Sequence, residues 1–344
     1  MNLYSQKNMG IKGLVESGYL NSIPPEYVFP SNLNDLEVEE VPTVDFSQLT
    51  AGTPDERSKA IQVIGKACRE WGFFMVINHS MPRRLMDEML NVGERFFDLA
   101  EEEKQDHAGK ELFDPIRCGT GFNNGLGNVF LWRDYLKVHV HPHFHAPHKP
   151  ADFRETSEEY CKKARDVAEE LLKGISKSLG QEENYIHKKM DVESGSQLLV
   201  MNLYPPCPRP ELVMGMPPHS DHGILTLLMQ NDVCGLQILH NGKWVPVNPP
   251  PYSFLVNTGD HMEILTNGRY ESVVHQVVVN SNATRMTIAT GHGPPLGAII
   301  SPAAELVDSE NHPPKYQGMK YRDYIELQQT NQLEGKSCLD RVRI

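Results

Sequence analysis

The stretch of sequence that decides the fold runs from residue 196 to residue 300, where short apolar runs alternate with Pro and Gly. These runs are QLLVMNLY (197–204), GILTLLMQ (223–230), GLQILHNGKWVPV (235–247), SFLVNTGD (253–260), ESVVHQVVV (271–279) and RMTIATG (285–291). Many short strands separated by turn signals are typical of an antiparallel barrel or jelly roll. The Asn241-Gly242 pair between two apolar runs predicts a hairpin. The expected fold class is therefore α+β, with a jelly-roll core.

Helical spacing of apolar residues dominates the chain before this core. It predicts helices at Ile11–Ser17, Pro54–Trp71, Pro82–Leu99 and Thr156–Leu179. Two runs, 41–46 and 72–78, are typical of strands. The expected organisation is an N-terminal extension at 1–40, an N-terminal region at 41–150, a long supporting helix and connector at 151–195, the jelly-roll domain at 196–300 and a C-terminal segment with a helix at 301–344.

Composition narrows the class of protein. The chain has 344 residues, of which 33 are basic and 45 acidic, and its net charge of −12 argues against nucleic acid or an anionic membrane as the main partner. The six cysteines are scattered without a C-x-x-C pair, which favours reduced thiols in the cytosol over a disulfide framework or a zinc site. Because no apolar run has the length of a signal peptide or a membrane span, the expected location is the cytoplasm.

The strongest local signal is His219-Ser220-Asp221. On a strand, residues i and i+2 face the same side, so an imidazole and a carboxylate would point together into the barrel. His275 lies among apolar residues on a later predicted strand and could supply a third ligand. Two imidazoles and one carboxylate on one face of a metal, with the other positions open, are typical of non-haem Fe(II) oxygenases.

A second signal is an arginine in an apolar, β-branched strand. Burying Arg285 costs free energy unless its guanidinium meets an anion, and its planar fork suits a carboxylate. Thr287 lies on the same face of that strand, and Asn202 and Tyr204 offer inward polar groups on an earlier strand. An H-x-D triplet is common by chance and a lone strand histidine is more often part of the core. The coincidence of several such features on separate strands favours a site.

With these motifs in view, the chain resembles the plant 2-oxoglutarate/Fe(II)-dependent dioxygenases. The resemblance runs nearly end to end, through GIKGLVESG (10–18), VPTVDF (41–46), WGFFMVINHS (71–80), NLYPPCP (202–208), HSDHGILTLLMQ (219–230), GLQIL (235–239), NTGD (257–260), TNGRY (266–270), HQVVVN (275–280) and RMT (285–287). The segment WRDYLKVH at Trp132–His139 favours the branch of flavanone 3-dioxygenase-like and downy-mildew-susceptibility (salicylate or flavone hydroxylase) enzymes.

The resemblance implies a double-stranded β-helix core and assigns roles to the motif residues. His219, Asp221 and His275 are expected to bind iron. Arg285, Thr287, Tyr204 and Asn202 are expected to bind 2-oxoglutarate, although the family usually has Ser where Thr287 stands. Fe(II), 2-oxoglutarate and O2 are the implied cofactor and cosubstrates, with ascorbate as the reductant in vitro.

The family places its substrate at the mouth of the barrel, which gives a set of candidate contacts. They are Phe122, Asn123, Tyr135, Lys137, Leu203, His222, Gly291 and His292. Lys137 could pair with a phenolate or a carboxylate, or could be a solvated surface lysine. Gly291 stands where flavonoid-oxidising relatives often have a stacking Phe, which argues against a simple flavanone 3-hydroxylase. His292 could supply a polar wall, and His222 is expected only to shape the entrance.

The expected function on these grounds is oxidation of a small plant specialised metabolite, such as a flavonoid, phenolic acid or alkaloid, by a monomeric enzyme. Hydroxylation is favoured, while desaturation and ring closure stay open. Two alternatives remain at this point. One is an iron oxidase of the same fold that does not use 2-oxoglutarate, and the other is a barrel that binds a small molecule without turnover.

Overall fold

The core consists of two sheets, and the larger has the strand order β1-β2-β10-β7-β12-β5-β4-β3. Its strands are β1 (Thr43–Asp45), β2 (Phe73–Ile77), β3 (Ile116–Asn123), β4 (Val129–His141), β5 (Ser196–Tyr204), β7 (Leu225–Gln230), β10 (Phe254–Thr258) and β12 (Arg285–Gly293). All neighbouring pairs are antiparallel except β1 and β2. The computed structural model describes residues 10–18, 20, 22–29, 36–123, 129–308, 310–330 and 335–344.

The smaller sheet has the order β6-β11-β8-β9. Its strands are β6 (Met216–His219), β8 (Leu236–His240), β9 (Lys243–Pro246) and β11 (His275–Val277). A separate pair joins β13 (Ile299–Ile300) to β14 (Met319–Lys320). The cavity described below is lined by side chains of both main sheets. The fold is the jelly-roll, or double-stranded β-helix, expected from the sequence.

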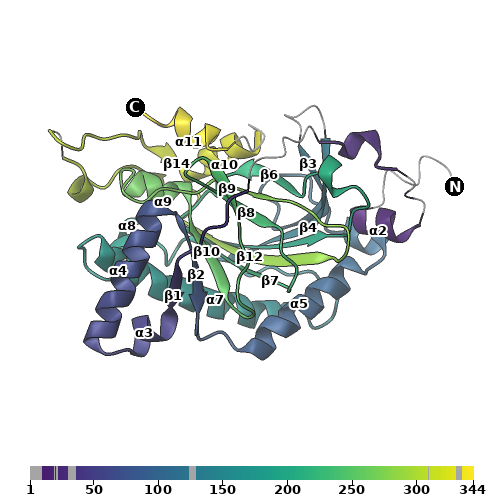
Figure 1. Cartoon of the computed structure of the whole chain (residues 1–344), viewed down its shortest axis with the longest axis horizontal. Coiled ribbons are helices and arrows are strands. Elements are labelled where there is room, and N and C mark those ends of the chain that lie inside the picture. Colours follow the sequence, from purple (N-terminus) through teal and green to yellow (C-terminus); the bar gives the residue numbers. More distant parts are fainter. Residues whose placement is uncertain are drawn as a thin grey trace.

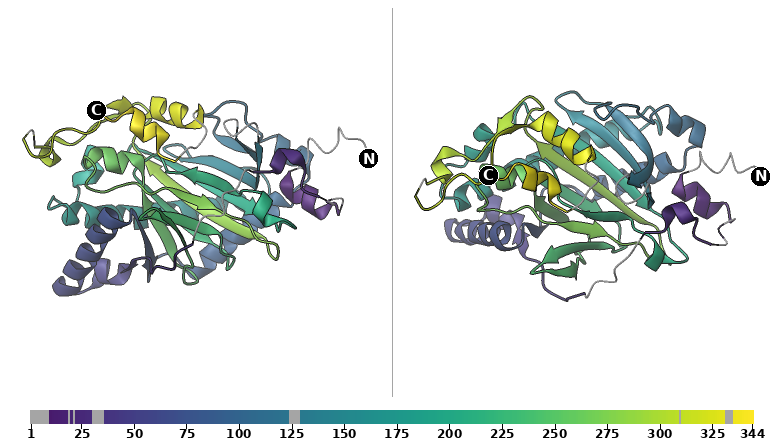
Figure 2. Two further views of the ribbon diagram at one scale, coloured as in Figure 1. Left: turned by 45° about the horizontal axis from the view of Figure 1, so that its top comes forward. Right: turned by 90° about the horizontal axis from the view of Figure 1, so that it is seen from above.

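Helices surround the two sheets, and α4, α5 and α7 pack against strands of the larger one (Figure 1). They are α2 (Ile11–Glu16), α3 (Phe46–Ala51), α4 (Pro54–Glu70), α5 (Arg83–Phe97), α6 (Glu101–Gln105), α7 (Phe153–Ser178), α8 (Tyr185–Lys189), α9 (Asp260–Leu265), α10 (Tyr321–Thr330) and α11 (Ser337–Arg341), with single 3-10 turns η1 (Pro25–Tyr27), η2 (Pro210–Leu212) and η3 (Ala304–Leu306). The C-terminal helices α10 and α11, in yellow, lie together beside the strands in both views of Figure 2.

Strand alternation in β12 separates the hydrophobic core from the cavity. Met286 and Ile288 belong to the main apolar core, which also contains the buried faces of α5 and α7. Arg285, Thr287 and Gly291, at the alternate positions, line the cavity instead. Because successive side chains of a strand point to opposite faces, one strand serves both the packing and the site.

The sequence-predicted elements agree with the structure in type and nearly in extent. The helix predicted at Thr156–Leu179 spans Phe153–Ser178, and the helix predicted from Pro54 begins there, where Thr53 and Glu56 cap each other. The Asn241-Gly242 hairpin is confirmed, with positive φ angles of 48° and 77° at these residues, as a type I′ turn requires.

The sequence interpretation missed the hairpin formed by β3 and β4. β4 is 13 residues long, and apolar side chains alternate with basic or histidine side chains over its second half, LKVHVH (136–141). The apolar members, such as Leu136 and Val138, lie in the main core. The period-two pattern was present in the sequence, but Trp132–His139 was interpreted only as a family motif and not as a strand.

Candidate active site

The cavity between the two sheets encloses about 320 Å³ and collects most of the predicted site residues. Those that line it are Tyr135, Lys137, Asn202, Tyr204, His219, Asp221, His222, His275, Arg285, Thr287 and Gly291. They come from β4, β5, β6, β11 and β12, and from the segment that follows β6. Residues up to 156 positions apart in the chain, Tyr135 and Gly291, are therefore brought to one place by the pairing of the strands.

His219, Asp221 and His275 each present one ligand atom, and these atoms lie within 4.8 Å of one another. β6 and β11 pair so that the two histidines face each other in register, with ring centroids 4.2 Å apart. The Nε2 atoms of His219 and His275 are 3.7 and 3.6 Å from Asp221 Oδ1. Asp221 is not on a strand, because β6 ends at His219. It reaches the same point from the segment after the strand.

Backbone carbonyls hold both imidazole rings in the orientation that a metal needs. Nδ1 of His219 lies 2.9 Å from Pro217 O, and Nδ1 of His275 lies 3.2 Å from Val273 O. Nδ1–H donates to the carbonyl in each case, so the lone pair of Nε2 is directed to the space shared with Asp221. Two imidazole nitrogens and one carboxylate oxygen suit Fe(II).

Electrostatics keep His219 and Asp221 in their metal-binding protonation states. Burial, reinforced by His275, lowers the pKa of His219 to about 3. Burial opposes ionisation of Asp221, but the His275 and His219 rings outweigh it and lower the pKa of this carboxyl to about 2. A neutral imidazole and an ionised carboxylate are the forms that bind a metal.

Asn257, on β10, orients the Asp221 carboxylate and was not predicted from the sequence. Its Nδ2 donates to Asp221 Oδ2 at 2.9 Å, and the residue is buried. Asn257→Ala should therefore lower the affinity for Fe(II) by roughly 10–100-fold, the usual effect of losing such a supporting partner. Equilibrium titration with Fe(II) under anaerobic conditions measures this, with the exposed Asn282→Ala as control. An unchanged affinity would contradict the role.

Arg285 is a buried cation without a counter-charge. Its side chain is 1% exposed, and it forms no ion pair with any described carboxylate. Nη2 donates to Gln230 Oε1 at 2.8 Å, while Nε and Nη1 make no hydrogen bond in the described part of the chain. The guanidinium lies 5.3 Å from the Tyr204 ring centroid. A buried guanidinium that lines a cavity and has unused donors suits a carboxylate ligand.

Thr287 and Asn202 lie beside this arginine. Thr287 follows Arg285 by two positions on the same face of β12, and Asn202 pairs with Thr287 across β5. Asn202 Nδ2 lies 3.3 Å from Thr287 Oγ1. The four residues expected to bind 2-oxoglutarate, including Tyr204 opposite Arg285, therefore form one polar patch in the cavity.

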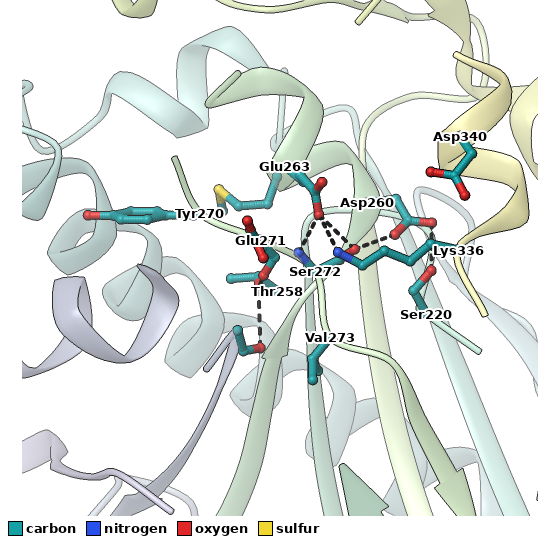
Figure 3. A network of polar contacts seen from close by, with 12 residues as sticks. Ser220, Thr258, Asp260, Glu263, Tyr270, Glu271, Ser272, Val273, Lys336 and Asp340 are labelled. Atoms are coloured by element: carbon teal, nitrogen blue, oxygen red, sulfur yellow. Dashed lines mark hydrogen bonds and ion pairs between the residues drawn. The ribbon is translucent and has the colours of Figure 1, made fainter. Parts of the chain in front are cut away.

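Behind the three ligands lies a buried acidic network that the sequence interpretation did not identify (Figure 3). Asp260, at the start of α9, accepts hydrogen bonds from Ser220 (3.1 Å), Ser272 (2.7 Å) and Tyr324 (2.7 Å). Its backbone N–H donates to the carbonyl of Asp221 at 2.8 Å. Burial raises the pKa of Asp260 to about 6, against the effect of these donors. The network holds Ser220 in place, and Ser220 lies between the ligands His219 and Asp221 in the sequence.

Glu263, one turn later in α9, ties the C-terminal segment to the same network. The side chain is 2% exposed and lies 2.8 Å from Lys336 Nζ. It also accepts from Tyr316 OH at 2.6 Å and from the backbone N–H of Ser272 at 2.8 Å. Figure 3 shows Glu263 and Lys336 meeting at Ser272, on the approach to β11.

Glu263→Gln should destabilise the protein by about 3 kcal/mol, since breaking a buried ion pair leaves an uncompensated charge. Burial opposes ionisation of Glu263, but Lys336 and the hydrogen bonds lower its pKa below the ordinary 4.5. The carboxylate therefore stabilises the fold above about pH 4.5, and this contribution is lost as the pH falls through the lowered pKa.

Urea unfolding at neutral and acidic pH measures this effect. The difference between wild type and Glu263→Gln should shrink in acid. Glu305→Gln is the matched control, because Glu305 pairs with Lys189 at the surface and should leave the unfolding free energy nearly unchanged. A constant difference across the pH range would contradict the assignment.

The structure corrects the prediction for two candidate substrate contacts. Leu203 and His292 do not line the cavity. Leu203 packs in the main core, and His292 is buried with Nδ1 3.3 Å from the carbonyl of Leu225. Each follows or precedes a cavity-facing residue on its strand, so each points to the opposite face.

The remaining candidates are placed as follows. His222 lines the cavity wall, where its Nδ1 lies 2.8 Å from Tyr321 OH, rather than only shaping an entrance. A Cβ built on Gly291 meets no atom within 4 Å. The side chains of Phe122 and Asn123 lie outside the part of the chain that the structure describes. Arg117 and Arg133 also line the cavity and were not predicted.

A jelly roll that presents two imidazoles and a carboxylate at one point, beside a buried arginine with free donors, defines a non-haem Fe(II) oxygenase. Comparison with known proteins gives the family. Residues 195–294 match the 2OG-Fe(II) oxygenase superfamily, and residues 41–160 match the N-terminal region described as non-haem dioxygenase in morphine synthesis N-terminal. The chain belongs to the 2-oxoglutarate/Fe(II)-dependent dioxygenases and is an enzyme that uses both Fe(II) and 2-oxoglutarate.

Relatives and solved structures agree with this assignment. The chain is 44% identical to 2-oxoglutarate-dependent dioxygenase 19 of Oryza sativa subsp. japonica, over 88% of this chain and 90% of the relative. It is 37% identical to Protein DOWNY MILDEW RESISTANCE 6 of Arabidopsis thaliana, over 95% and 97%. The crystal structure of JOX2 in complex with 2OG, Fe and JA superposes with a TM-score of 0.88 at 31% identity and covers 98% of both chains.

Proposed function

We propose that this dioxygenase hydroxylates a small plant specialised metabolite inside the jelly-roll cavity, and that 2-oxoglutarate is converted to succinate and CO2 in the same turnover. The observation that carries the proposal is the presence of the three ligands and the unpaired Arg285 in one cavity. Bound Fe(II), with 2-oxoglutarate and O2, supplies the oxidising power. The protein supplies binding, orientation and exclusion of water.

His219, Asp221 and His275 hold the iron in this proposal. The backbone carbonyls that accept from Nδ1 of each histidine keep Nε2 directed to the metal, and Asn257 holds the second oxygen of Asp221. These three side chains would hold the metal at the wall of the cavity, and the rest of the cavity would receive the cosubstrates and the substrate.

Arg285 binds the distal carboxylate of 2-oxoglutarate through its guanidinium, whose Nε and Nη1 make no other hydrogen bond in the described part of the chain. Thr287 adds a hydroxyl to the same carboxylate, and Tyr204 closes the pocket beside the guanidinium. Asn202 lies next to Thr287 and would contact the same cosubstrate. This arrangement favours 2-oxoglutarate dependence over an iron oxidase that does without the keto acid.

The substrate occupies the part of the cavity walled by Tyr135, Lys137, His222 and Gly291. The names of the relatives cover several metabolite classes: flavanone 3-dioxygenase 2, thebaine 6-O-demethylase and a rice dioxygenase for auxin oxidation are among them. They support flavonoids, phenolic acids and alkaloids as the classes to test. We also propose that the enzyme is cytoplasmic, which the lack of any disulfide among the described cysteines supports, and that it is a monomer. Among the described helices, none combines the length and apolarity of a membrane span.

Succinate release tests the function. Purified protein with Fe(II), ascorbate, 2-oxoglutarate and O2 should form succinate, and a substrate from a panel of flavonoids, phenolic acids and alkaloids should accelerate it with equimolar product. Product without any succinate would favour the oxidase that does not use 2-oxoglutarate. Binding of a metabolite with neither product nor succinate would favour a non-catalytic barrel.

A further inference from the structure

The cavity is strongly cationic, although the chain as a whole carries a net charge of −12. Arg117, Arg133, Lys137 and Arg285 all line it. Asp221, a proposed iron ligand, is the one carboxylate among the described lining residues. The charges of bound Fe(II) and 2-oxoglutarate would cancel each other. The four basic side chains would then still outnumber the single carboxylate of Asp221.

Three of these cations lie together on the β3–β4 hairpin. Arg117 on β3 is directly opposite Lys137 on β4. Directly opposed residues of an antiparallel pair have neighbouring side chains, and like charges there are destabilising. Arg133 and Lys137 flank Tyr135 on the same face of β4, at 5.3 and 5.5 Å from its ring centroid. The hairpin therefore brings three basic side chains together near Tyr135.

None of the three has a carboxylate partner in the described part of the chain. Arg117, Arg133 and Lys137 form no ion pair there, and Nε of each arginine is buried without a hydrogen bond. Burial, with the charges of Arg117 and Arg133, lowers the pKa of Lys137 to about 7. An arrangement that costs free energy in the ligand-free protein is typical of a binding site for the opposite charge.

Arg133 is distinguished from the other two by its contacts. Its Nη1 donates to Asn202 Oδ1 at 3.3 Å, and Asn202 in turn contacts Thr287. It belongs to the polar patch proposed to hold 2-oxoglutarate. Arg117 and Lys137 have no contact of this kind with that patch. Arg117 and Lys137 therefore form a separate pair of basic side chains, in the part of the cavity proposed to hold the substrate.

We propose that Arg117 and Lys137 form a carboxylate-binding subsite, and that the substrate of this enzyme is a small organic acid with an apolar body. The inference rests on the proposed function and names its substrate class. A carboxylate matches the planar donor fork of an arginine and is fully ionised at neutral pH, whereas a phenol ionises near pH 10. Apolar side chains in the same cavity provide the surface for the body of the acid: Leu112, Phe113, Leu131, Leu296 and Ile325.

Binding to the holoenzyme tests the subsite directly. Calorimetric titration of the protein with Fe(II) and 2-oxoglutarate, without O2, compares benzoate, cinnamate, indole-3-acetate and octanoate with their methyl esters. At least one acid should bind, and its ester should bind roughly tenfold to a hundredfold more weakly. Failure of every acid to bind, or equal affinity of acid and ester, would overturn the proposal. Tight binding of neutral phenols alone would do so as well.

Variants assign the effect to the two residues. Lys137→Met and Arg117→Leu should each weaken binding of the acid roughly tenfold or more and leave binding of the ester unchanged. Lys162→Met, which removes an exposed lysine of α7, is the matched control and should bind both as wild type does. Equal losses for acid and ester in the Lys137 variant would indicate a packing role and refute the subsite.

Thermal stability gives a readout that needs no substrate. Removing one of two opposed cations should raise the melting temperature of ligand-free Lys137→Met by about 1–3 °C. A lower melting temperature would contradict the proposed repulsion. The proposed function is tested separately by succinate release from 2-oxoglutarate in the wild type. Succinate without acid binding refutes only the subsite, and acid binding without succinate refutes only the oxygenase function.

Discussion

Asp221→Ala is expected to abolish turnover and to weaken Fe(II) binding by more than the roughly 10–100-fold that the loss of a supporting residue costs. The carboxylate supplies the single negative ligand, and its oxygen lies 3.6–3.7 Å from both histidine Nε2 atoms. Without it, two neutral imidazoles remain, which hold a divalent cation poorly. Asn257 Nδ2 would also lose its acceptor.

Anaerobic Fe(II) titration and succinate release measure the two effects in the same preparation. Asp232→Ala removes a nearby exposed carboxylate and is the matched control. Asp221 takes part in no apolar core cluster, so the variant should fold. Circular dichroism checks that it does. Full activity of Asp221→Ala with normal iron content would refute the ligand assignment.

Arg285→Met should raise the 2-oxoglutarate requirement by about 30-fold to several thousandfold. This range corresponds to the 2–5 kcal/mol that is lost when one partner of a buried charge pair is removed. In the ligand-free protein the same change removes a buried cation with two unsatisfied donors, so it should not destabilise the fold. The variant therefore separates binding from stability.

Two measurements check this separation. The dependence of succinate formation on 2-oxoglutarate concentration gives the change in requirement. Addition of 2-oxoglutarate should raise the melting temperature of the wild type and leave that of Arg285→Met unchanged. Arg84→Met, at an exposed position of α5, is the control. A normal requirement in Arg285→Met would mean that another residue holds the keto acid.

Local patterns in the sequence predicted the centre of the site because the relevant rules are local. His219 and Asp221 are two positions apart, and His275 and Arg285 stand out as polar residues in apolar strands. The strand pairing that joins them is a property of the fold, and it was expected as a consequence of the jelly roll. The observed register of His275 with His219 agrees with that expectation.

The supporting residues could not be predicted in the same way. Asn257, Asp260 and Glu263 act on partners that lie 36, 40 and 73 positions away, namely Asp221, Ser220 and Lys336. Nothing in the neighbouring sequence marks these residues as buried and paired. Their roles depend on where α9 and the C-terminal segment lie relative to β6, which only the three-dimensional structure gives.

The errors at Leu203 and His292 have a different origin. Both were chosen by their position in a resembling family and not by strand geometry. Leu203 lies between Asn202 and Tyr204, and both of these face the cavity. Alternation along β5 therefore excludes it, and alternation from Gly291 excludes His292. The information was present in the sequence, because strand alternation applied to β5 and β12 places Leu203 and His292 on the face away from the cavity.

The free space at Gly291 has a consequence for the selectivity of oxidation. A methyl group at this position would meet no described atom within 4 Å, and a larger side chain would extend into the cavity where we propose that the substrate binds. The carbon held nearest the metal is the one that reacts, so a bulkier side chain would tilt the bound molecule and expose a different C–H bond. A substitution at residue 291 is therefore expected to change which C–H bond is oxidised, without altering the residues proposed to bind iron and 2-oxoglutarate.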